Sequence, residues 1–594
     1  MLHCAQAVLS KRASLNYMNR NAEYSAVNDT VKGAFLRRVW KLITPYWRSE
    51  EKATAWLLLI SVIALSLFSV QVSVFFNSWY RDFYNALQNK DLAAFTHLIL
   101  YFSGIAAIAI LAAVYRLYLT QLLTIRWRRW LTEQHFARWL ADKNYYHLEQ
   151  GGYTDNPDQR LSEDLNEFTT STLSLGLGLM SSVVSLVSFS VILWGVSGSI
   201  ELFGITIPGY MFWAAMLYAL VGSLLTHWIG KRLIPLNNQQ ERFEADLRFA
   251  LVRVRENAES IALSEGERNE NQRLSGRFQM IWNNFRTSMK VQKRLTFFTS
   301  GYSQIALIFP FIVAAPRYFA GKIELGDLMQ INSAFGNVQE NFSWFISAYG
   351  TLASWRATSD RLLSFRQAMS DHEAQQPAIE RTRSEDALEL RNLGLEIAGG
   401  RQLLNDANLR IGAGERVMLS GRSGSGKSSL LRALGGLWPS GSGQIRLPAG
   451  PALFLPQRPY LPIGTLREAM SYPQPADHYA AERFADVLNQ CRLEHLIPRL
   501  DESNHWQRFL SPGEQQRVAF ARALLIAPRW LLVDEATSAM DEDDETAMHR
   551  AIIDGLPGLT LVSVGHRSSL QRFHDRHVRV EGGQLVEQRA TGSV

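Results

Sequence analysis

Long uncharged apolar stretches recur through the first 360 residues of the chain. At about 1.5 Å per helical residue, five of them are long enough to cross about 30 Å of hydrocarbon. They are Trp56–Phe76, Ala93–Tyr115, Thr169–Ile200, Leu202–Thr226 and Leu295–Pro316, followed by a sixth and more polar stretch at Met329–Trp355. A soluble helical core would explain one or two such runs. The pattern therefore predicts a polytopic α-helical membrane domain with six transmembrane helices.

Basic residues collect in two of the segments that connect these runs. The segment after the second run carries Arg126, Arg128, Arg129, Arg138 and Lys143, and the one after the fourth carries Lys231, Arg232, Arg242, Arg248, Arg253 and Arg255. Because Lys and Arg mark cytoplasmic loops, we expect the N-terminus, both segments and everything after the sixth run to lie in the cytoplasm. Residues 1–50 have no apolar run behind an early basic patch, which predicts a cytoplasmic N-terminal segment rather than a cleaved signal peptide.

Both basic segments are long, periodic and nearly free of proline. We therefore expect the membrane helices to continue well beyond the bilayer. The chain must reverse once in each segment, and turn residues stand at Gly151–Gly152–Tyr153 to Asn156–Pro157 and at Glu259–Glu267.

The character of the chain changes after residue 365. A charged, proline-interrupted linker is predicted at 366–386, between a membrane domain at 51–365 and an α/β domain at 387–594. The net charge of +6 is modest, and no basic stretch interleaves with aromatic residues near the α/β domain, so no nucleic-acid partner is expected. Cys4 and Cys491 lack metal-ligand spacing, which predicts incidental thiols.

A glycine-rich loop indicates the chemistry of the last third of the chain. The sequence GRSGSGKS at Gly421–Ser428 fits a pattern in which backbone N–H groups wrap phosphates, a lysine reaches the β and γ oxygens, and a hydroxyl meets Mg²⁺. The residues predicted to bind the nucleotide here are Gly421, Arg422, Ser423, Gly424, Ser425, Gly426, Lys427, Ser428 and Ser429, with Ser428 also a metal ligand. By itself the loop indicates only a nucleotide.

A second stretch indicates which class of nucleotide-binding protein this is. It is LSPGEQQRVAFARALLIAPRWLLVDEATSAMD at Leu510–Asp541. It places LSPGE before a helical run and an apolar strand, Trp530–Val533, that ends in Asp534–Glu535. Combined with the glycine-rich loop, this order resembles the ATP-binding cassette (ABC) transporter family. The resemblance implies an α/β P-loop ATPase with an exporter-like membrane domain, and ATP and Mg²⁺ as cofactors.

The same resemblance implies roles for individual residues in ATP hydrolysis. Asp534 matches the aspartate that holds Mg²⁺, and Glu535 the residue that polarises the attacking water. Gln457, in FLPQRPY, matches the glutamine that senses Mg²⁺ and the γ-phosphate, and His566, in VSVGHR, the histidine that contacts the γ-phosphate. Phosphoryl transfer needs positioning and charge stabilisation of this kind.

Ser511 and Gly513 match the family's signature loop, which closes on the nucleotide of a partner cassette. Asp541 matches the aspartate of the family's D-loop. The chain has one cassette, so the resemblance implies a homodimer with contacts through both domains. Each ATP would lie between the glycine-rich loop of one copy and the signature loop of the other.

The sequence departs from the family pattern at two places. The signature, usually LSGGQ, has Pro512 for the first glycine and Glu514 for the glutamine. Just before Gly399–Gly400, Ile397 stands where an aromatic ring usually stacks on adenine. Trp438 or Tyr472 is the alternative partner for the base.

Further strings extend the resemblance to one branch of the family. NSWYRDFYNALQ at Asn77–Gln88, IRWRRWLT at Ile125–Thr132 and DNPDQR at Asp155–Arg160 are similar to peroxisomal acyl-CoA half-transporters. They are more similar to bacterial fused proteins whose membrane part resembles the SbmA/BacA peptide-uptake permeases. This implies ATP-driven movement, with import favoured, of peptides or other bulky hydrophilic solutes across a bacterial inner membrane. Efflux, acyl-CoA transport and a membrane-anchored regulatory ATPase remain alternatives.

Polar residues recur on one face of the sixth run. Ser333, Asn337, Glu340, Asn341 and Trp344 are spaced as one side of a helix. An ionisable group at bilayer depth usually faces a water-filled path, so the stripe is predicted to line a hydrophilic cavity. Alternatively, Glu340 lies nearer an interface or caps a helix break beside Gly336.

Overall fold

The computed structural model describes residues 32–151, 156–202, 205–374, 378–384, 386–397, 401–448, 450 and 452–588. The predictions on Cys4, on Gly152–Tyr153, on Asp155 and on Gly399–Gly400 lie outside these residues. Contacts within the chain define two compact units. The first comprises Met1–Asp142 and Gly152–Ser370, and the second comprises Lys143–Gly151 and Asp371–Val594.

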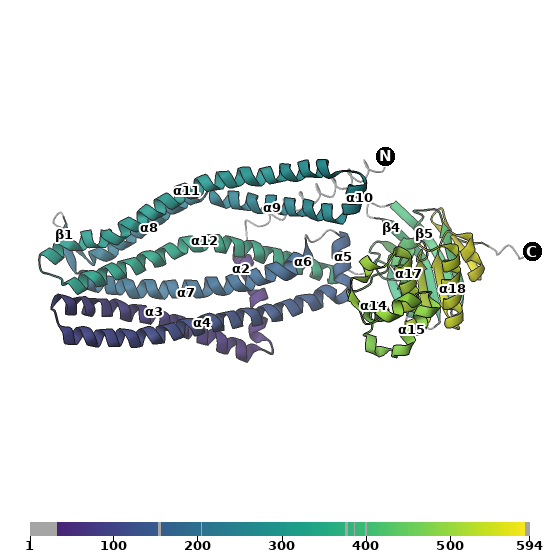
Figure 1. The fold of residues 1–594 in the computed structure, drawn as a ribbon, viewed down its shortest axis with the longest axis horizontal. Coiled ribbons are helices and arrows are strands. Elements are labelled where there is room, and N and C mark those ends of the chain that lie inside the picture. The colour runs from purple at the N-terminus through teal and green to yellow at the C-terminus, as the bar shows by residue number, and fades with distance from the viewer. Residues whose placement is uncertain are drawn as a thin grey trace, which may run out of the picture. The chain divides into compact units, whose positions relative to one another are not determined.

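The first unit is helical (Figure 1). Its helices are α2 (Lys32–Ile43), α3 (Lys52–Gln88), α4 (Leu92–Leu140), α6 (Pro157–Gln159), α7 (Leu165–Ser197), α8 (Tyr210–Gly230), α9 (Leu233–Glu256), α10 (Ala258–Leu263), α11 (Glu267–Phe319) and α12 (Leu325–Ala374). A π-helical turn, η4 (Arg160–Asp164), joins α6 to α7. Among the described residues, five helical segments are long and apolar enough to cross a membrane. They contain the first, second and fifth predicted runs whole, the third up to Ser197 and the fourth from Tyr210. The sixth run lies in α12, which is long but more polar.

Two helices extend far beyond the width of a bilayer, as expected. α4 has 49 residues and α11 has 53, which corresponds to about 74 Å and 80 Å against about 30 Å of hydrocarbon. The short helix α5 (Asn144–Gly151) ends at the first residue of the first predicted turn, and α10 overlaps the second. The contact pattern groups α5 with the second unit, in which Lys143 Nζ donates to the carbonyl of Gly435 at 2.5 Å.

The fourth apolar run differs from its prediction as a continuous span. Its first residues belong to a two-stranded hairpin of β1 (Ser199–Leu202) and β2 (Ile205–Pro208), and the helix begins only at Tyr210. Gly198 and Gly209 flank the hairpin with φ of 63° each. This backbone conformation interrupts a helix and favours glycine. Ile and Thr between the two glycines also favour a strand.

The second unit is an α/β domain with two sheets. The larger has the order β14-β13-β6-β12-β11-β8, formed by β6 (Arg416–Gly421), β8 (Ala452–Leu455), β11 (Trp530–Asp534), β12 (Thr560–Val564), β13 (Arg576–Glu581) and β14 (Gln584–Gln588). The smaller has the order β3-β7-β4-β5, formed by β3 (Glu380–Ser384), β4 (Ala387–Ile397), β5 (Arg401–Gly412) and β7 (Gly441–Pro448). A short pair, β9 (Gly464–Thr465) and β10 (Ser503–Asn504), stands apart from both sheets. The first nine residues of the predicted linker, 366–374, continue α12.

Helices pack on the larger sheet. They are α13 (Lys427–Leu434), α14 (Leu466–Ser471), α15 (Ala481–Gln490), α16 (Trp506–Phe509), α17 (Pro512–Ile526) and α18 (Glu542–Gly555). One apolar core, which includes Phe484, Trp506 and Phe520, joins α14, α15, α17 and α18 to β11. A second core, which includes Leu404 and Val562, lies between the two sheets. The predicted fold class, a helical membrane domain followed by an α/β P-loop domain, is confirmed.

Acid is expected to destabilise the second unit through His574. Burial, together with the nearby His549, His577 and Arg416, lowers the pKa of His574 to about 4 against the pull of its bond to the Leu570 carbonyl. The unfolded chain takes up this proton near pH 6.5, the native chain only near pH 4. The stabilisation is therefore complete above pH 6.5 and is lost as the pH falls toward 4, by about 3 kcal/mol.

Replacing His574 with leucine is expected to reduce the difference in denaturation midpoint between pH 7.5 and pH 5. Replacing the exposed His478 with glutamine is the control and should keep the wild-type difference. An unchanged pH dependence in His574→Leu would contradict the assignment.

Candidate active site

Four parallel strands of the larger sheet end at one edge and bring the predicted motifs together. β6, β12, β11 and β8 are mutually parallel, and their registers pair Leu419 with Val564, Val564 with Asp534, and Val533 with Leu455. The glycine-rich loop follows β6, His566 follows β12, Asp534 and Glu535 end β11, and Gln457 follows β8. Ligands of open α/β sheets bind at this edge.

The glycine-rich loop adopts backbone conformations that only glycine tolerates well. Gly421, Gly424 and Gly426 have φ of 147°, 78° and 104°. A Cβ on Gly421 would lie 2.7 Å from the Val580 carbonyl oxygen. α13 then begins at Lys427, so the loop leads directly into a helix N-terminus. Arg422, Ser423 and Gly424 are exposed, and Ser425 and Ser429 are half-buried. Backbone N–H groups at such a helix start favour an anion.

Lys427 is buried and is held by its own loop. Its ammonium donates to the carbonyls of Gly421 at 2.9 Å and Arg422 at 3.1 Å. Burial lowers the pKa of Lys427, although the charges of Glu535 and Asp534 oppose the shift. It is the only lysine between Ala387 and Val594. Among the described residues, no carboxylate lies within ion-pair distance of Lys427, and a buried cation of this kind is suited to receive phosphate oxygens.

Ser428 and Asp534 face each other across the loop. The Ser428 hydroxyl donates to Asp534 Oδ1 at 3.0 Å. Burial raises the pKa of Asp534 against the Ser428 bond, and the neighbouring charge of Glu535 adds to the rise. A hydroxyl and a carboxylate are oxygen ligands of the type that Mg²⁺ uses, and Mg²⁺ completes its shell with phosphates and water. The pair therefore fits this ion. Within the described residues, no group of three or more acidic, His or Cys ligands is found.

Glu535 and His566 meet at the same edge. Glu535 Oε1 lies 3.0 Å from His566 Nε2. Glu535 has φ of 49°, an uncommon conformation for a residue with a side chain, and its N–H donates to the Val564 carbonyl at 3.1 Å. Such backbone strain is retained where the surroundings fix it, often at functional sites. The Glu535 carboxylate remains 29% exposed, so water can reach it.

The signature loop forms the start of α17. Ser511 is its N-cap, and Glu514 closes a capping box by accepting from the Ser511 N–H at 2.9 Å and hydroxyl at 2.8 Å. Burial acts to raise the pKa of Glu514, but the hydrogen bonds from Ser511 and His495 lower it. Pro512 occupies the first helical position, which proline favours. A Cβ on Gly513 would lie 3.1 Å from the Ala539 carbonyl oxygen.

Asp541 is the N-cap of α18, where it accepts from the Asp544 N–H at 2.7 Å. In the described part of the chain, no hydrogen bond or ion pair joins Ser511, Gly513 or Asp541 to the loop Gly421–Ser429. The structure thus brings Lys427, Ser428, Asp534, Glu535 and His566 together and leaves the signature residues with other partners.

Two buried residues of the site are absent from the sequence-based prediction. Gln516 donates to the Gln457 carbonyl at 3.0 Å and the Ser538 hydroxyl at 3.2 Å, and accepts from the Ala539 N–H at 3.0 Å. It therefore ties the segment of Gln457 to the segment that leads to Asp541. The side chain of Gln457 itself is exposed.

Glu545 is the second such residue. It is 1% exposed, and its carboxylate accepts from the hydroxyls of Thr537 at 2.6 Å and Ser569 at 2.8 Å, with Arg567 at 3.6 Å. Thr537 lies two residues after Glu535, and Arg567 directly follows His566. Glu545 thus connects the two segments that carry Glu535 and His566. In the sequence, Glu545 is one of several acidic residues at the start of a helix, so nothing distinguishes it from its neighbours.

Replacing Glu545 with alanine is expected to lower the free energy of unfolding by about 3 kcal/mol, because it leaves two hydroxyls without their acceptor and removes the carboxylate that pairs with Arg567. Chemical denaturation of the purified chain measures this. Glu542→Ala, in the same helix but exposed, is the control and should change little. A loss below about 1 kcal/mol in Glu545→Ala would contradict the role assigned to the carboxylate.

The candidates for stacking on adenine differ in their surroundings. Ile397 is 39% exposed at the end of β4. The Trp438 indole donates to the Glu396 carbonyl at 3.1 Å, and its ring packs against the apolar core. Tyr472 is 44% exposed and contacts Tyr460 edge-on. The partner of the base stays a prediction.

The polar stripe of α12 contains residues that contact α7 or their own helix and residues that are exposed. Asn341 donates to the Ser185 hydroxyl of α7 at 2.8 Å, and the Trp344 ring lies against Gly178. Asn337 donates back to the Ser333 carbonyl at 2.9 Å. Glu340 and Gly336 are exposed.

Comparisons with known proteins agree with this arrangement. Residues 41–319 match the family model described as ABC transporter transmembrane region 2, and residues 404–538 match that described as ABC transporter. The chain is 35% identical over 543 residues to the inner membrane ABC transporter ATP-binding protein YddA of Escherichia coli, covering 90% of this chain and 95% of that protein. It is 30% identical to the human lysosomal cobalamin transporter ABCD4, covering 92% and 95%.

A solved bacterial Atm1-family ABC exporter with ATP bound has the same fold, with a TM-score of 0.71, 19% identity and coverage of 90% of this chain and 95% of that one. The exporter-like fold expected from the sequence is thus confirmed. The chain belongs to the ABC transporter family, as a half-transporter in which a transmembrane domain is fused to an ABC ATPase domain that binds and hydrolyses ATP to drive transport.

Proposed function

We propose that the chain acts as a homodimer that imports peptides or other bulky hydrophilic solutes across a bacterial inner membrane. ATP hydrolysis is supported by one observation. At one edge of the larger sheet, the structure brings together Lys427, Ser428, Asp534, Glu535 and His566. Two ATP molecules would be bound, each between Gly421–Ser429 of one copy and Ser511–Gly513 of the other.

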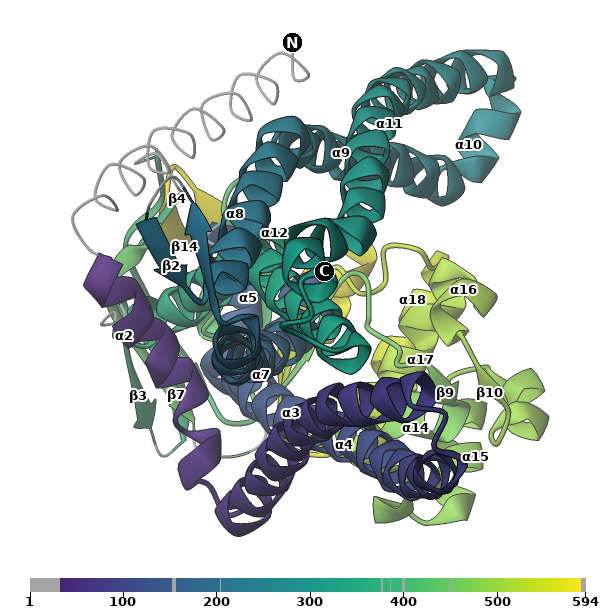
Figure 2. The ribbon, with the colours of Figure 1, turned by 90° about the vertical axis from the view of Figure 1, so that its left-hand side faces the viewer.

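Several features of the described residues support a second copy. Among the described residues, no hydrogen bond or ion pair joins the signature residues to the chain's own glycine-rich loop, as expected if a second copy completes the site. α9 and α11 lie side by side and are joined by α10 (Figures 1 and 2). None of the residues of α9 or α10 is buried. Large apolar side chains of α9, α10 and α11 are exposed, among them Phe249, Leu263 and Phe285. Apolar patches of this kind mark interfaces.

Each catalytic residue has a role that its position allows. Lys427 would exchange its two carbonyl partners for the β and γ oxygens, and Ser428 and Asp534 would hold Mg²⁺, which neutralises charge that develops on the phosphates. Glu535 would accept a proton from the attacking water, which its exposed carboxylate can reach. His566, 3.0 Å from Glu535, would donate to the γ-phosphate. Asp541 and Gln457 would contact the partner cassette and the γ-phosphate respectively.

The proposed cargo and direction are supported by the membrane domain and by the relatives. Glu340 is exposed on a helix of the membrane domain, consistent with a hydrophilic path. One relative bears a name that assigns it to cobalamin, a large polar solute, and another is named an inner membrane protein. We place the N-terminus and the ATPase domain in the cytoplasm because of the basic segments around α4 and α9. The exporter fold of the solved relative favours efflux as the second candidate.

Transport into liposomes tests the proposal. Labelled peptides and cobalamin are supplied outside, and ATP is placed either only inside or only outside. Internal ATP energises molecules whose cassettes face the lumen, for which import in the cell appears as accumulation. Accumulation with internal ATP that disappears in Glu535→Gln is the expected result. Accumulation only with external ATP would establish efflux, and hydrolysis without any accumulation would favour acyl-CoA cargo or a regulatory ATPase.

A further inference from the structure

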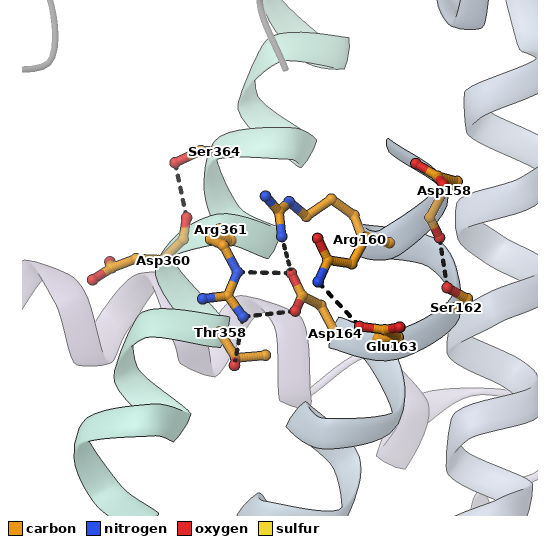
Figure 3. A network of polar contacts seen from close by, with 10 residues as sticks. Asp158, Arg160, Ser162, Glu163, Asp164, Thr358, Asp360, Arg361 and Ser364 are labelled. Atoms are coloured by element: carbon orange, nitrogen blue, oxygen red, sulfur yellow. Dashed lines mark hydrogen bonds and ion pairs between the residues drawn. The ribbon is translucent and has the colours of Figure 1, made fainter. Parts of the chain in front are cut away.

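A buried carboxylate joins the start of α7 to α12. Asp164 has a side chain that is 5% exposed. Arg361 of α12 binds both of its oxygens, with Nε to Oδ2 at 2.9 Å and Nη2 to Oδ1 at 2.6 Å. Arg160 donates to Oδ2 at 2.8 Å from the other side (Figure 3). We call these three residues the Asp164 clamp.

The backbone beneath the clamp is unusual. Arg160 and Asp164 are the two ends of η4, a π-helical turn between α6 and α7. Such turns are rare and frequently lie at functional sites. Arg361 is fixed in turn by its own helix, because its Nη2 also donates to the Thr358 hydroxyl at 3.0 Å. Further along the two helices, the Trp355 indole donates to the Thr172 hydroxyl at 2.8 Å. The clamp is therefore one of several side-chain hydrogen bonds that join α12 to α7 and to the turn before it.

The clamp lies close in sequence to the points where the chain passes between its two units. The chain enters the first unit after Gly151, nine residues before Arg160, and leaves it after Ser370, nine residues after Arg361. Each passage thus lies nine residues along the chain from one of the two arginines that bind the same carboxylate. Toward its N-terminus, α12 runs from Arg361 without interruption to the exposed Glu340.

Stability alone does not explain this choice of residues. Well-packed apolar side chains of similar size often stabilise a protein as much as a buried ion pair or more. A bidentate guanidinium–carboxylate contact is instead directional, because it holds its two helices in one relative orientation. Two discrete arrangements of such contacts are a common basis of conformational switching.

We propose that the Asp164 clamp is the joint through which nucleotide-driven movement of the segment Lys143–Gly151 reaches α12 and the path beside Glu340. Its three residues are positioning residues for transport and take no part in hydrolysis. The inference rests on the homodimer and the two-state cycle of the proposed function. Loosening the joint uncouples the membrane domain from the ATPase while hydrolysis continues.

Distances between the two copies test this in the full chain in lipid nanodiscs. Cys4 is replaced by serine, and a spin label is placed at the exposed Lys322, between α11 and α12, as Lys322→Cys. Pulsed electron paramagnetic resonance then gives the label-to-label distance without nucleotide and with ATP and vanadate. We expect the wild type to show a shift. Asp164→Asn should hydrolyse ATP within twofold of the wild-type rate but lose the shift.

Two further variants make the result decisive. Arg361→Lys keeps the charge but cannot bind both oxygens, and it should lose most of the shift. If Asp164→Asn does not fold, Arg361→Lys decides by the same criterion. The matched control is Asp360→Asn, which removes the charge of a half-buried carboxylate that pairs at 3.9 Å with Arg356 on the same helix and should behave as wild type.

The outcomes separate the two proposals. Wild-type shifts in both clamp variants would overturn the clamp, as would loss of hydrolysis and shift together, since that indicates a purely structural role. Absence of any distance between copies, or of any shift in the wild type, would overturn the homodimer or its cycle and the clamp with it.

Discussion

Replacing Glu535 with glutamine is expected to reduce ATP hydrolysis by about 10²- to 10⁴-fold while ATP binding remains, because the amide cannot accept the proton of the attacking water. The change preserves the shape of the side chain and the N–H bond to Val564 that holds its backbone. It also leaves Lys427 and the Ser428–Asp534 pair in place. Phosphate release measures the rate, and a fluorescent ATP analogue measures binding.

Glu542→Gln is the matched control for this prediction. Glu542 is an exposed carboxylate seven residues further along the chain, so its neutralisation changes the net charge equally without touching the site. It should hydrolyse ATP at the wild-type rate. Hydrolysis in Glu535→Gln within about tenfold of wild type would mean that another group activates the water.

Replacing Lys427 with methionine is expected to weaken ATP binding by about 10- to 150-fold. This corresponds to the loss of one charge-assisted hydrogen bond to the phosphates, about 1.5–3 kcal/mol. Methionine has a similar length, and without a charge it leaves no buried ammonium to be satisfied. The folded cassette should therefore retain its thermal midpoint or gain slightly. Isothermal titration with a non-hydrolysable ATP analogue gives the affinity.

Arg550→Gln, at an exposed position on α18, controls for the loss of one positive charge. Its affinity should equal that of the wild type. If Lys427→Met bound the analogue within twofold of wild type, the ammonium would have to remain with the carbonyls of Gly421 and Arg422 in the bound state. The proposed exchange of partners would then be wrong.

Much of the site could be predicted because its residues sit in contiguous motifs at strand ends. The glycine-rich loop, Asp534–Glu535 and His566 each follow an apolar strand, and parallel strands bring such positions to one edge of a sheet. The proximity of Ser428 and Asp534, 106 residues apart, follows from that rule. Most of the apolar runs could likewise be predicted as helices, since helix length and bilayer width fix their pattern.

The residues that escaped prediction act through tertiary contacts that no local pattern announces. Gln516 lies within a helix, and its importance depends on a carbonyl 59 residues away. Asp164 and Arg361 are separated by 197 positions. The hairpin between Gly198 and Gly209 was misread because its strands are as apolar as a span, and only the backbone of the two glycines ends the helices.

The single lysine of the cassette also makes Lys427 a chemical handle. Acyl-phosphate derivatives of ATP transfer their acyl group to an amine beside the bound phosphates, and the cassette, from Ala387 to Val594, offers them one side-chain amine. Burial depresses the pKa of that amine, which increases the fraction of the nucleophilic free base. Acylation within the cassette would therefore report occupancy of one defined site, in a membrane preparation and without knowledge of the transported solute.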